Sequence, residues 1–278
     1  RGHEVHALCI NDQVVPAGVT VHRYRVVGRN AKDVHPWVID LETKVLRGEA
    51  CARAAQKLLD QGFYPEVICV HPGWGEGLFL REIWPQAKQL HYVEYFYSSA
   101  GGDVGFDPEF GLPDFNMRSR VRMKNANSLL NLNTMDRGVS PTWWQRSTVP
   151  EAYRSAISVI HDGIDTEVVK PDPEAVFSFQ GKEGGLREFR QGEQILTFVN
   201  RNLEPSRGYH IFMRALPELL WRHPELQVLI VGGDEVSYGA RPESGSYKMR
   251  YFTEGEERID PSRIHFLGRI SYTGYLKL

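Results

Sequence analysis

Two arginines stand six positions apart where a predicted strand gives way to a predicted helix. Ile195–Val199 is an apolar run typical of a buried strand, and the polar turn that follows it carries Arg201 and Arg207. Amides at the start of a helix attract anions, and a guanidinium group can hold a phosphate with two hydrogen bonds. The turn over 200–208 therefore predicts an anion receptor, which we interpret as a holder for the diphosphate of a nucleotide-activated substrate.

The same turn allows a purely structural interpretation. Glu204 lies between the two arginines, and Gly208 ends the turn before the helical pattern of 210–222 begins. Two surface arginines that pair with Glu204 would produce the same residues without any ligand. Spacing alone does not separate these interpretations.

Two more glycine-containing turns follow predicted strands in the same part of the chain. One carries Gly233 and Asp234, and the other carries Gly268 and Arg269. Ligands of open α/β sheets collect beyond the carboxyl ends of the strands, so the turn with Gly233 and Asp234 could approach the same ligand. A plain tight turn has the same residues. Neither GxxxxGK[ST] nor GxGxxG is present, which argues against a P-loop and against a simple dinucleotide fingerprint.

A third polar loop occurs in the first half of the chain. The predicted strand over 67–70 runs directly into a glycine-rich loop with His71, Gly73, Trp74 and Glu76. At a strand end, His71 could act as a general base, orient a ligand or cap the strand, and Glu76 could cap the next helix. The loop is a candidate polar pocket.

Glu94 lies in an aromatic run, 90–97, that predicts another strand. A buried carboxylate needs a partner, so Glu94 pairs with an arginine or belongs to a site. Other chemistry lacks support: the ten histidines form no HExxH, and no GxSxG elbow occurs. We expect neither a metal nor a cofactor.

Composition limits the class of protein. The 278 residues carry a formal net charge of −2, which leaves no global footprint for nucleic acid. No apolar run reaches the roughly 20 residues of a membrane span, and no secretory signal is present. Three separated cysteines, Cys9, Cys51 and Cys69, lack metal or redox spacing, which indicates reduced core thiols in a reducing compartment.

Strand and helix patterns alternate through most of the chain, which predicts α/β architecture with parallel sheets. Apolar periodicity fades over 166–193, so we expect two Rossmann-like domains, 1–165 and 194–278, joined by a polar linker. The region from 236 to 260 is interpreted as a polar excursion. Both ends of the chain fall within a pattern, which we interpret as a fragment with each domain incomplete.

One predicted helix, 115–132, has a basic face. Its cations are Arg118, Arg120, Arg122 and Lys124, which a solvated helix face explains. Peripheral contact with a membrane through this face is a second hypothesis. A short strand is expected to follow over 129–134.

Long phrases of the sequence resemble a known family. HPGWGEGLFLREIWPQAK, YVEYFYSSAGGDVGFDPEF, SPTWWQRSTVPEAYRSAISVIHDGIDTEVVKPD and VNRNLEPSRGYHIFMRALPELLWRHPELQVLIVGGDEVSYG resemble bacterial family 4 glycosyltransferases, the large retaining GT-B family. The N-terminal part is similar to the subgroup with an HPGWGE loop. The resemblance extends from about Val67 to Gly268.

The resemblance implies roles for the candidate residues. Arg201 and Arg207 would hold the donor diphosphate and stabilise the leaving group without a metal, with arginine where lysine is commoner in the family. His71 would face the reacting sugar. The implied catalytic set is Arg201, Arg207 and His71. The implied donor-binding set is Arg201, Glu204, Arg207, Gly208, Gly233, Asp234, Gly268 and Arg269. The implied acceptor-side set is His71, Gly73, Trp74, Glu76 and Glu94.

The implied reaction is transfer of a sugar, with retention, from a nucleoside-diphosphate sugar to a glycan or lipid-linked acceptor. Cell-surface polysaccharide or lipopolysaccharide synthesis at the inner face of the membrane, in the cytoplasm, would be its setting. The family's first glycine loop and its E-x7-E motif have no counterpart here, so we expect the fragment to be inactive and its parent active. A GT-B-fold sugar-nucleotide epimerase, a phosphorylase and a non-catalytic glycan-binding relative stay as alternatives.

Overall fold

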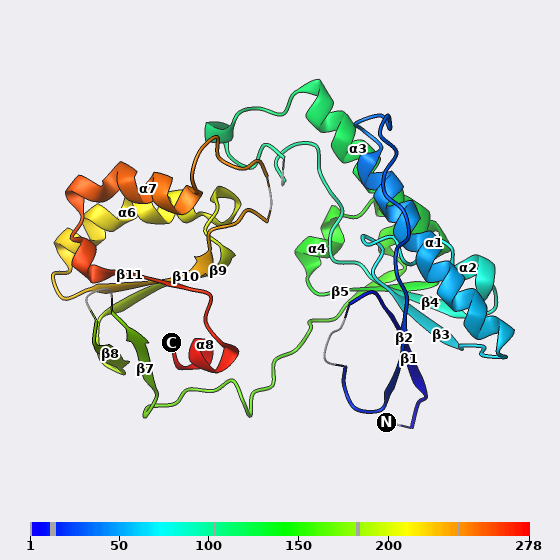
Figure 1. The fold of residues 1–278 in the computed structure, drawn as a ribbon, viewed down its shortest axis with the longest axis horizontal. Coiled ribbons are helices and arrows are strands. Elements are labelled where there is room, and N and C mark those ends of the chain that lie inside the picture. Colours follow the sequence, from blue (N-terminus) through cyan, green and yellow to red (C-terminus); the bar gives the residue numbers. More distant parts are fainter. Residues whose placement is uncertain (1, 12–14, 103, 182–183, 238) are drawn as a thin grey trace. The chain divides into compact units, whose positions relative to one another are not determined.

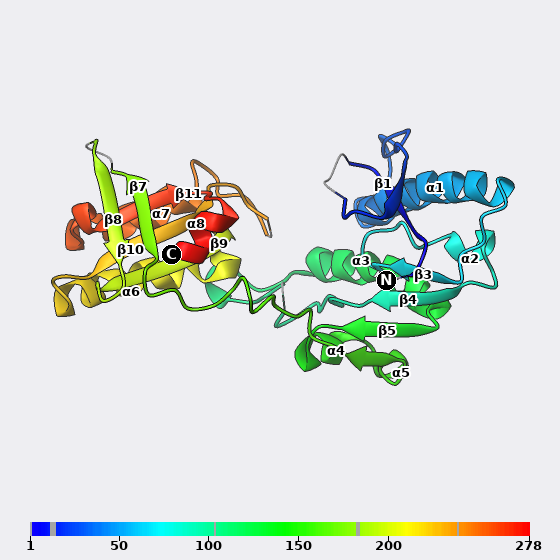
Figure 2. The same ribbon diagram turned by 90° about the horizontal axis from the view of Figure 1, so that it is seen from below.

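A computed structural model describes residues 2–11, 15–102, 104–181, 184–237 and 239–278 of the protein. The chain divides into two compact units, and the boundary along the sequence falls between Gly163 and Ile164 (Figures 1 and 2). Each unit is an α/β structure with a parallel sheet. The α/β class expected from the alternating patterns is therefore confirmed.

Unit 1 contains a four-stranded parallel sheet in the order β3-β4-β5-β6 and a separate parallel pair, β1-β2. The strands of unit 1 are β1 (Val5–Cys9), β2 (Val19–Arg23), β3 (Val67–Val70), β4 (Lys88–Tyr92), β5 (Arg137–Ser140) and β6 (Ile157–Val159). Its helices are α1 (Ile39–Asp60), α2 (Leu80–Ile83), α3 (Phe115–Thr134), α4 (Trp143–Thr148) and α5 (Glu151–Arg154), with a 3₁₀ turn at Pro108–Phe110.

The main core of unit 1 lies between α1 and the sheet. Cys51, Ala55 and Leu58 recur at helical spacing on α1 and pack in one buried cluster with Ile68 and Val70 of β3. Helix α3 lies beside α1, as Figure 1 shows. Both helices contact the loop that follows β3, α1 at Gly75 and α3 at Pro72.

Unit 2 contains a three-stranded parallel sheet in the order β11-β10-β9 and an antiparallel hairpin, β7-β8. The strands of unit 2 are β7 (Val176–Gln180), β8 (Leu186–Arg190), β9 (Ile195–Asn202), β10 (Gln227–Gly233) and β11 (Ile264–Gly268). Its helices are α6 (Tyr209–Arg222), α7 (Tyr247–Gly255) and α8 (Tyr272–Lys277), with 3₁₀ turns at Pro205–Arg207, Glu256–Arg258 and Pro261–Arg263. Helices α6 and α7 cover one face of the sheet, and the hairpin and α8 lie on the other (Figures 1 and 2).

The stretch interpreted as a polar linker is the largest difference from the sequence prediction. Val176–Gln180 and Leu186–Arg190 pair as the antiparallel strands β7 and β8 instead, and Phe177 and Phe189 are buried against Leu229 of β10. The linker prediction is therefore wrong for these residues. The periodicity was weak because a two-stranded hairpin places only alternate side chains in the core.

Smaller corrections concern elements and burial. The strand expected over 129–134 is absent because α3 continues to Thr134, and the strand is β5 instead. Helix α7 lies within the region interpreted as a polar excursion. Of the three free cysteines, only Cys51 is buried; Cys69 is exposed, so it is not a core thiol.

Candidate functional site

The polar turns of unit 2 lie at one edge of its parallel sheet. Arg201 is the penultimate residue of β9, Gly233 is the last of β10 and Gly268 is the last of β11. Because neighbouring parallel strands run in the same direction, these three positions share the carboxyl edge of the sheet. We call this group the unit 2 carboxyl edge.

The local backbone of the turn after β9 follows from its sequence. Pro205 begins a 3₁₀ turn that ends at Arg207, and Gly208 adopts the left-handed conformation with φ 76°. Only glycine takes this conformation without a steric cost, and it lets α6 begin at once. The turn is thereby held between the strand and the helix.

The two arginines of this turn have different surroundings. The exposed Arg201 side chain has no hydrogen-bond or ion-pair partner among the residues that the structure describes. The Arg207 Nε atom lies 3.6 Å from the Glu204 Oε1 atom. Pairing with Glu204 therefore accounts for Arg207 but not for Arg201. One uncompensated guanidinium group is left at the edge.

Glu204 is fully buried, with 0% of its surface exposed. Its Oε2 atom accepts a hydrogen bond of 2.6 Å from the Ser237 amide, in the loop after β10. Asn202 also reaches this loop, because its amide group donates to the Ser237 hydroxyl at 2.7 Å. Buried Glu204 thus links the turn after β9 to the loop after β10. We interpret it as a positioning residue and not as a ligand contact.

The turns after β10 and β11 also touch each other. A Cβ atom on Gly233 would lie 2.7 Å from Asn202 Oδ1 and 3.1 Å from Arg269 Nε, so a larger residue there would displace these side chains. Arg269 donates to Asn202 Oδ1 at 3.3 Å and to Glu235 at 3.2 Å. Asp234 lies 3.5 Å from Lys248 Nζ. The structure thus brings the predicted donor-side residues to one edge, with Arg269 and Asp234 already paired.

The glycine-rich loop after β3 is clamped by two helices. Gly75 has φ 100°, and a Cβ atom there would lie 2.5 Å from the Lys44 carbonyl oxygen of α1. From α3, Asn127 and Asn131 donate to the Pro72 carbonyl oxygen at 2.7 and 3.2 Å. The loop is therefore fixed by backbone contacts on both sides.

Both ring nitrogens of His71 make hydrogen bonds. Nδ1 accepts a hydrogen bond of 3.2 Å from the Gly73 amide, so the proton is assigned to Nε2, which donates to Glu94 at 3.1 Å. The Trp74 ring stacks on the imidazole with a centroid distance of 4.3 Å. A histidine held in this way suits orientation of a ligand better than removal of a proton.

The partners of Glu76 and Glu94, the two candidate carboxylates of unit 1, were not evident from the sequence. Glu94 lies beyond the end of β4 and is exposed, so the expectation of a strand residue that is buried is wrong; its partner is His71 and not an arginine. Glu76 pairs instead with Arg47 of α1, through Nε at 3.0 Å and through the terminal nitrogen. This ion pair supports the interpretation that Glu76 is structural.

Tyr92 and Asp162 form a further polar pair that the sequence analysis missed. The Tyr92 hydroxyl donates to both Asp162 carboxylate oxygens, at 2.9 and 3.0 Å. Loss of hydration and this hydrogen bond raise the pKa of Tyr92 to about 12, so the hydroxyl keeps its proton. Tyr92 ends β4 and Asp162 follows β6, and their positions at strand ends were the signal available in the sequence.

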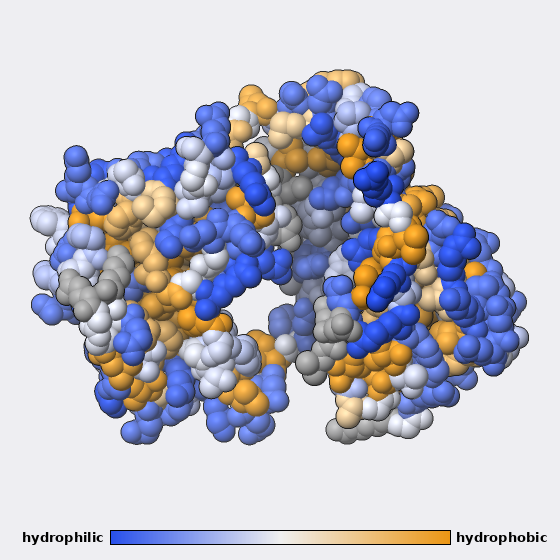
Figure 3. All heavy atoms as spheres, in the orientation of Figure 1, coloured by the Kyte–Doolittle hydropathy of each residue, from blue (hydrophilic) through white to orange (hydrophobic). Residues whose placement is uncertain are grey.

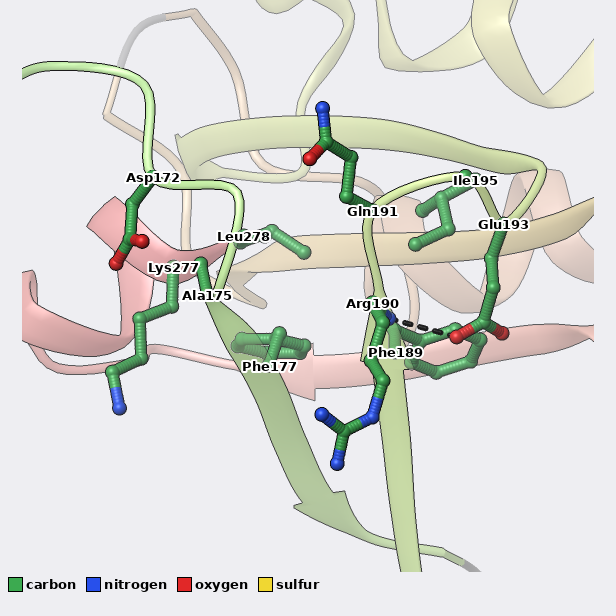
Figure 4. Close-up of a pocket in the computed structure, with 11 residues that line it drawn as sticks. Asp172, Ala175, Phe177, Phe189, Arg190, Gln191, Glu193, Ile195, Lys277 and Leu278 are labelled. Atoms are coloured by element: carbon green, nitrogen blue, oxygen red, sulfur yellow. Dashed lines mark hydrogen bonds between the residues drawn. The ribbon is translucent and has the colours of Figure 1, made fainter.

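A cavity of about 240 Å³ in unit 2 lies away from these residues. Ile195, Phe177 and Phe189 line it together with Lys277 and Leu278 (Figure 4). Ile195 is the first residue of β9, whereas Arg201 is near its other end. The cavity is therefore at the amino edge of the sheet and is separate from the candidate site.

Two parallel sheets, each in its own unit, with polar turns at the carboxyl edge of the unit 2 sheet define an α/β protein, and the architecture here is GT-B-like. A family model described as the glycosyl transferase family 4 group matches residues 1–169. The match covers more than half of the chain, which therefore belongs to this family. The coarse resemblance predicted from the sequence phrases is confirmed.

Solved structures and a curated relative resemble the chain at lower identity. Sucrose-phosphate synthase from Thermosynechococcus elongatus has a TM-score of 0.61 and 18% identity, over 99% of this chain and 63% of that one. The catalytic domain of starch synthase IV from Arabidopsis thaliana, solved with ADP and acarbose, has a TM-score of 0.50 and 15% identity, over 85% and 54%. A GDP-mannose-dependent mannosyltransferase of phosphatidylinositol monomannoside from Mycolicibacterium smegmatis is 30% identical over 92 residues. That match spans 32% of this chain and 22% of the relative.

Proposed function

We propose that this chain is the donor- and acceptor-binding part of a glycosyltransferase that uses a nucleoside-diphosphate sugar. The observation that carries the proposal is the unit 2 carboxyl edge, where Arg201 has no partner among the described residues and Arg207 lies 3.6 Å from the buried Glu204 carboxylate. Family membership supports the same reaction. Because the chain spans 22% of the mannosyltransferase and 63% of the synthase, the activity of the whole protein is part of the proposal.

In this proposal the arginines act on the leaving group. Cleavage of the sugar–phosphate bond places negative charge on the nucleoside diphosphate, and the two guanidinium groups at the sheet edge stabilise that charge. No metal or cofactor is then required. The Glu204 contact with the Ser237 amide keeps the turns after β9 and β10 in register around the diphosphate.

The acceptor is assigned to unit 1 in the same proposal. His71 lies beside the reacting sugar and holds Glu94 through its Nε2 proton, with Gly73 and Trp74 around it. The acceptor is a glycan or a lipid-linked glycan, and transfer proceeds with retention of configuration. Membership of the subgroup with the HPGWGE loop also belongs to this proposal.

Location is the last element of the proposal. No helix among the described residues has an apolar stretch long enough to cross a bilayer. We propose that the enzyme works in the cytoplasm at the inner face of the membrane, in synthesis of a cell-surface polysaccharide.

Calorimetry with UDP, GDP and ADP tests the donor site in this chain. We expect one diphosphate to bind and Arg201→Gln and Arg207→Gln each to weaken it. Arg222→Gln is the matched control, because Arg222 is exposed at the far end of α6 and pairs with Glu218. If no nucleoside diphosphate binds the chain, or if the control weakens binding equally, the donor site is wrongly placed.

Kinetics in the full-length protein test the chemical role. Loss of one preorganised donor costs about 2–4 kcal/mol, so kcat should fall roughly 10²- to 10³-fold for each arginine variant. A rise in KM with kcat intact would contradict the leaving-group role. Product analysis without an acceptor separates the epimerase alternative, since an epimerase converts the nucleotide sugar alone.

A further inference from the structure

Helix α3 has a charge distribution that its own stability does not explain. Its 20 residues include Arg118, Arg120, Arg122 and Lys124 and no acidic residue. A cation in the first turn, such as Arg118, opposes the helix dipole, and like charges four residues apart repel each other. The chain as a whole has a net charge of −2. The cations on this helix therefore point to a role beyond folding.

Two of these cations line a groove, and the other two do not. The groove has a volume of about 320 Å³, and Arg118 and Arg122 line it whereas Arg120 does not. The other lining residues are Tyr97, Ser99, Phe115, Ser119, Val121 and Asn125. Figure 3 shows hydrophilic and hydrophobic side chains side by side over the segment that contains α3.

The wall of the groove is held rigidly. The Asn125 side chain accepts from the Tyr97 amide at 3.1 Å and donates to the Tyr97 carbonyl oxygen at 2.7 Å. Lys124 Nζ lies 3.6 Å from the centroid of the Tyr97 ring. These contacts fix the strand-end loop against α3, so the groove exists without a ligand to shape it.

The two arginines in the groove are not neutralised by the described part of the chain. Arg118 donates to the Pro113 carbonyl oxygen at 2.6 Å, which is a neutral partner. Arg122 has no hydrogen-bond or ion-pair partner among the described residues. Ser99 and Ser119 add hydroxyl groups to the lining. Guanidinium groups and hydroxyls in one groove match the oxygens of a phosphate group.

We propose that this groove binds a phosphate group of the acceptor, as a phosphate monoester or diester. The inference rests on the proposed function only in calling the ligand the acceptor, since the groove belongs to unit 1 and the donor site to unit 2. The phosphate can come from a lipid headgroup or from a soluble phosphorylated sugar, because the same oxygens are recognised in both. Phe115, which lines the groove and is 65% exposed, offers apolar contact to the group that carries the phosphate.

Calorimetry with sn-glycerol 3-phosphate, and sedimentation with phosphatidylcholine vesicles with and without phosphatidylglycerol, test the groove in the whole chain. The variants are Arg118→Gln and Arg122→Gln, and Arg120→Gln is the control with the same change of charge on the same helix. A hydrogen bond to a charged group is worth about 1.5–3 kcal/mol, so each groove variant should weaken binding about tenfold or more. Arg120→Gln should change it by less than about threefold, since exposed charges are screened.

Folding controls keep the test decisive. Arg118 also holds Pro113, so Arg122→Gln, which breaks no described contact, is the variant that decides. Equal thermal stability of Arg122→Gln and wild type excludes unfolding as the cause. Arg122→Lys keeps the charge but loses the two-pronged hydrogen bonding, and we expect intermediate affinity.

The binding results distinguish a failure of the groove from a failure of the proposed donor site. Binding of both the soluble phosphate and the anionic vesicles supports a lipid source, and binding of the soluble phosphate alone supports a free phosphorylated sugar. Equal loss in all three glutamine variants shows bulk charge and overturns the groove. No binding of glycerol phosphate or of anionic vesicles by a chain that still binds a nucleoside diphosphate overturns the groove and leaves the proposed function standing.

Discussion

Replacement of His91 by glutamine should make unit 1 less sensitive to acid. His91 lies on β4 with 0% of its surface exposed, and its Nε2 atom contacts Gln89 Oε1 at 3.2 Å. Its Nδ1 atom has no partner among the described residues. Burial, and then the nearby charge of Arg81, lower the pKa of His91 from 6.5 to about 4, although Asp136 acts in the opposite direction.

The sign of the effect follows from proton binding. Between pH 6.5 and about 4 the unfolded chain binds a proton at His91 that the folded chain does not, so stability falls as the pH falls. Above pH 6.5 His91 is neutral in both states and costs no stability. Below about pH 4 it is protonated in both states, and the free energy of unfolding has fallen by the full amount. One pKa unit is about 1.4 kcal/mol, so the loss is roughly 3 kcal/mol.

Urea unfolding at a series of pH values measures this loss. Tryptophan fluorescence is a suitable probe, because only Trp221 of the 6 tryptophans lies in unit 2. Wild type should lose roughly 3 kcal/mol more than His91→Gln between pH 7 and 4. Exposed His3→Gln is the control and should follow wild type. Parallel curves for wild type and His91→Gln would refute the assignment of the acid sensitivity to this buried imidazole.

Two further substitutions test how the loop and sheet of unit 1 are held. Gly75→Ala combines a positive φ with a Cβ atom 2.5 Å from the Lys44 carbonyl oxygen, and should cost about 2–4 kcal/mol in urea unfolding. Gly62→Ala, with φ 85° and open space around it, should cost only about 1 kcal/mol, and equal costs would show that the contact with α1 is unimportant. Arg81→Met removes hydrogen bonds to the Ala87 and Thr134 carbonyl oxygens and to Asp136, and should cost about 2–3 kcal/mol. Exposed Arg137→Met, which loses one bond to the Asp136 carbonyl oxygen, should lower the thermal midpoint far less; similar shifts would count against Arg81 as a structural hub.

Much of the fold was accessible from local pattern. The helix expected over 115–132 is α3, which runs over Phe115–Thr134, and the expected strand 67–70 is β3 itself. Long helical periodicity and short apolar runs between turn residues are strong signals because they need no knowledge of distant contacts. The β7 and β8 strands lack such a local signal, since the burial of their side chains depends on the sheet that they cover.

The candidate site divides in the same way. Arg201 and Gly208 were placed at the strand end and helix start by the sequence alone. The sequence alone did not show which way the Glu204 side chain points, because a short turn with the same residues allows its carboxylate to face solvent or the core. Only the path of the loop after β10, which brings the Ser237 amide within 2.6 Å, decides that Glu204 is buried.

By itself the sequence determined the family, the α/β class and the three strand-end turns of unit 2. Each of these depends on residue types and spacings over a few tens of positions. The tertiary structure alone decided the partners: His71 with Glu94 across 23 residues and Arg47 with Glu76 across 29. Such pairs depend on strand register and on the routes of the loops, which the whole fold sets and local spacing does not encode.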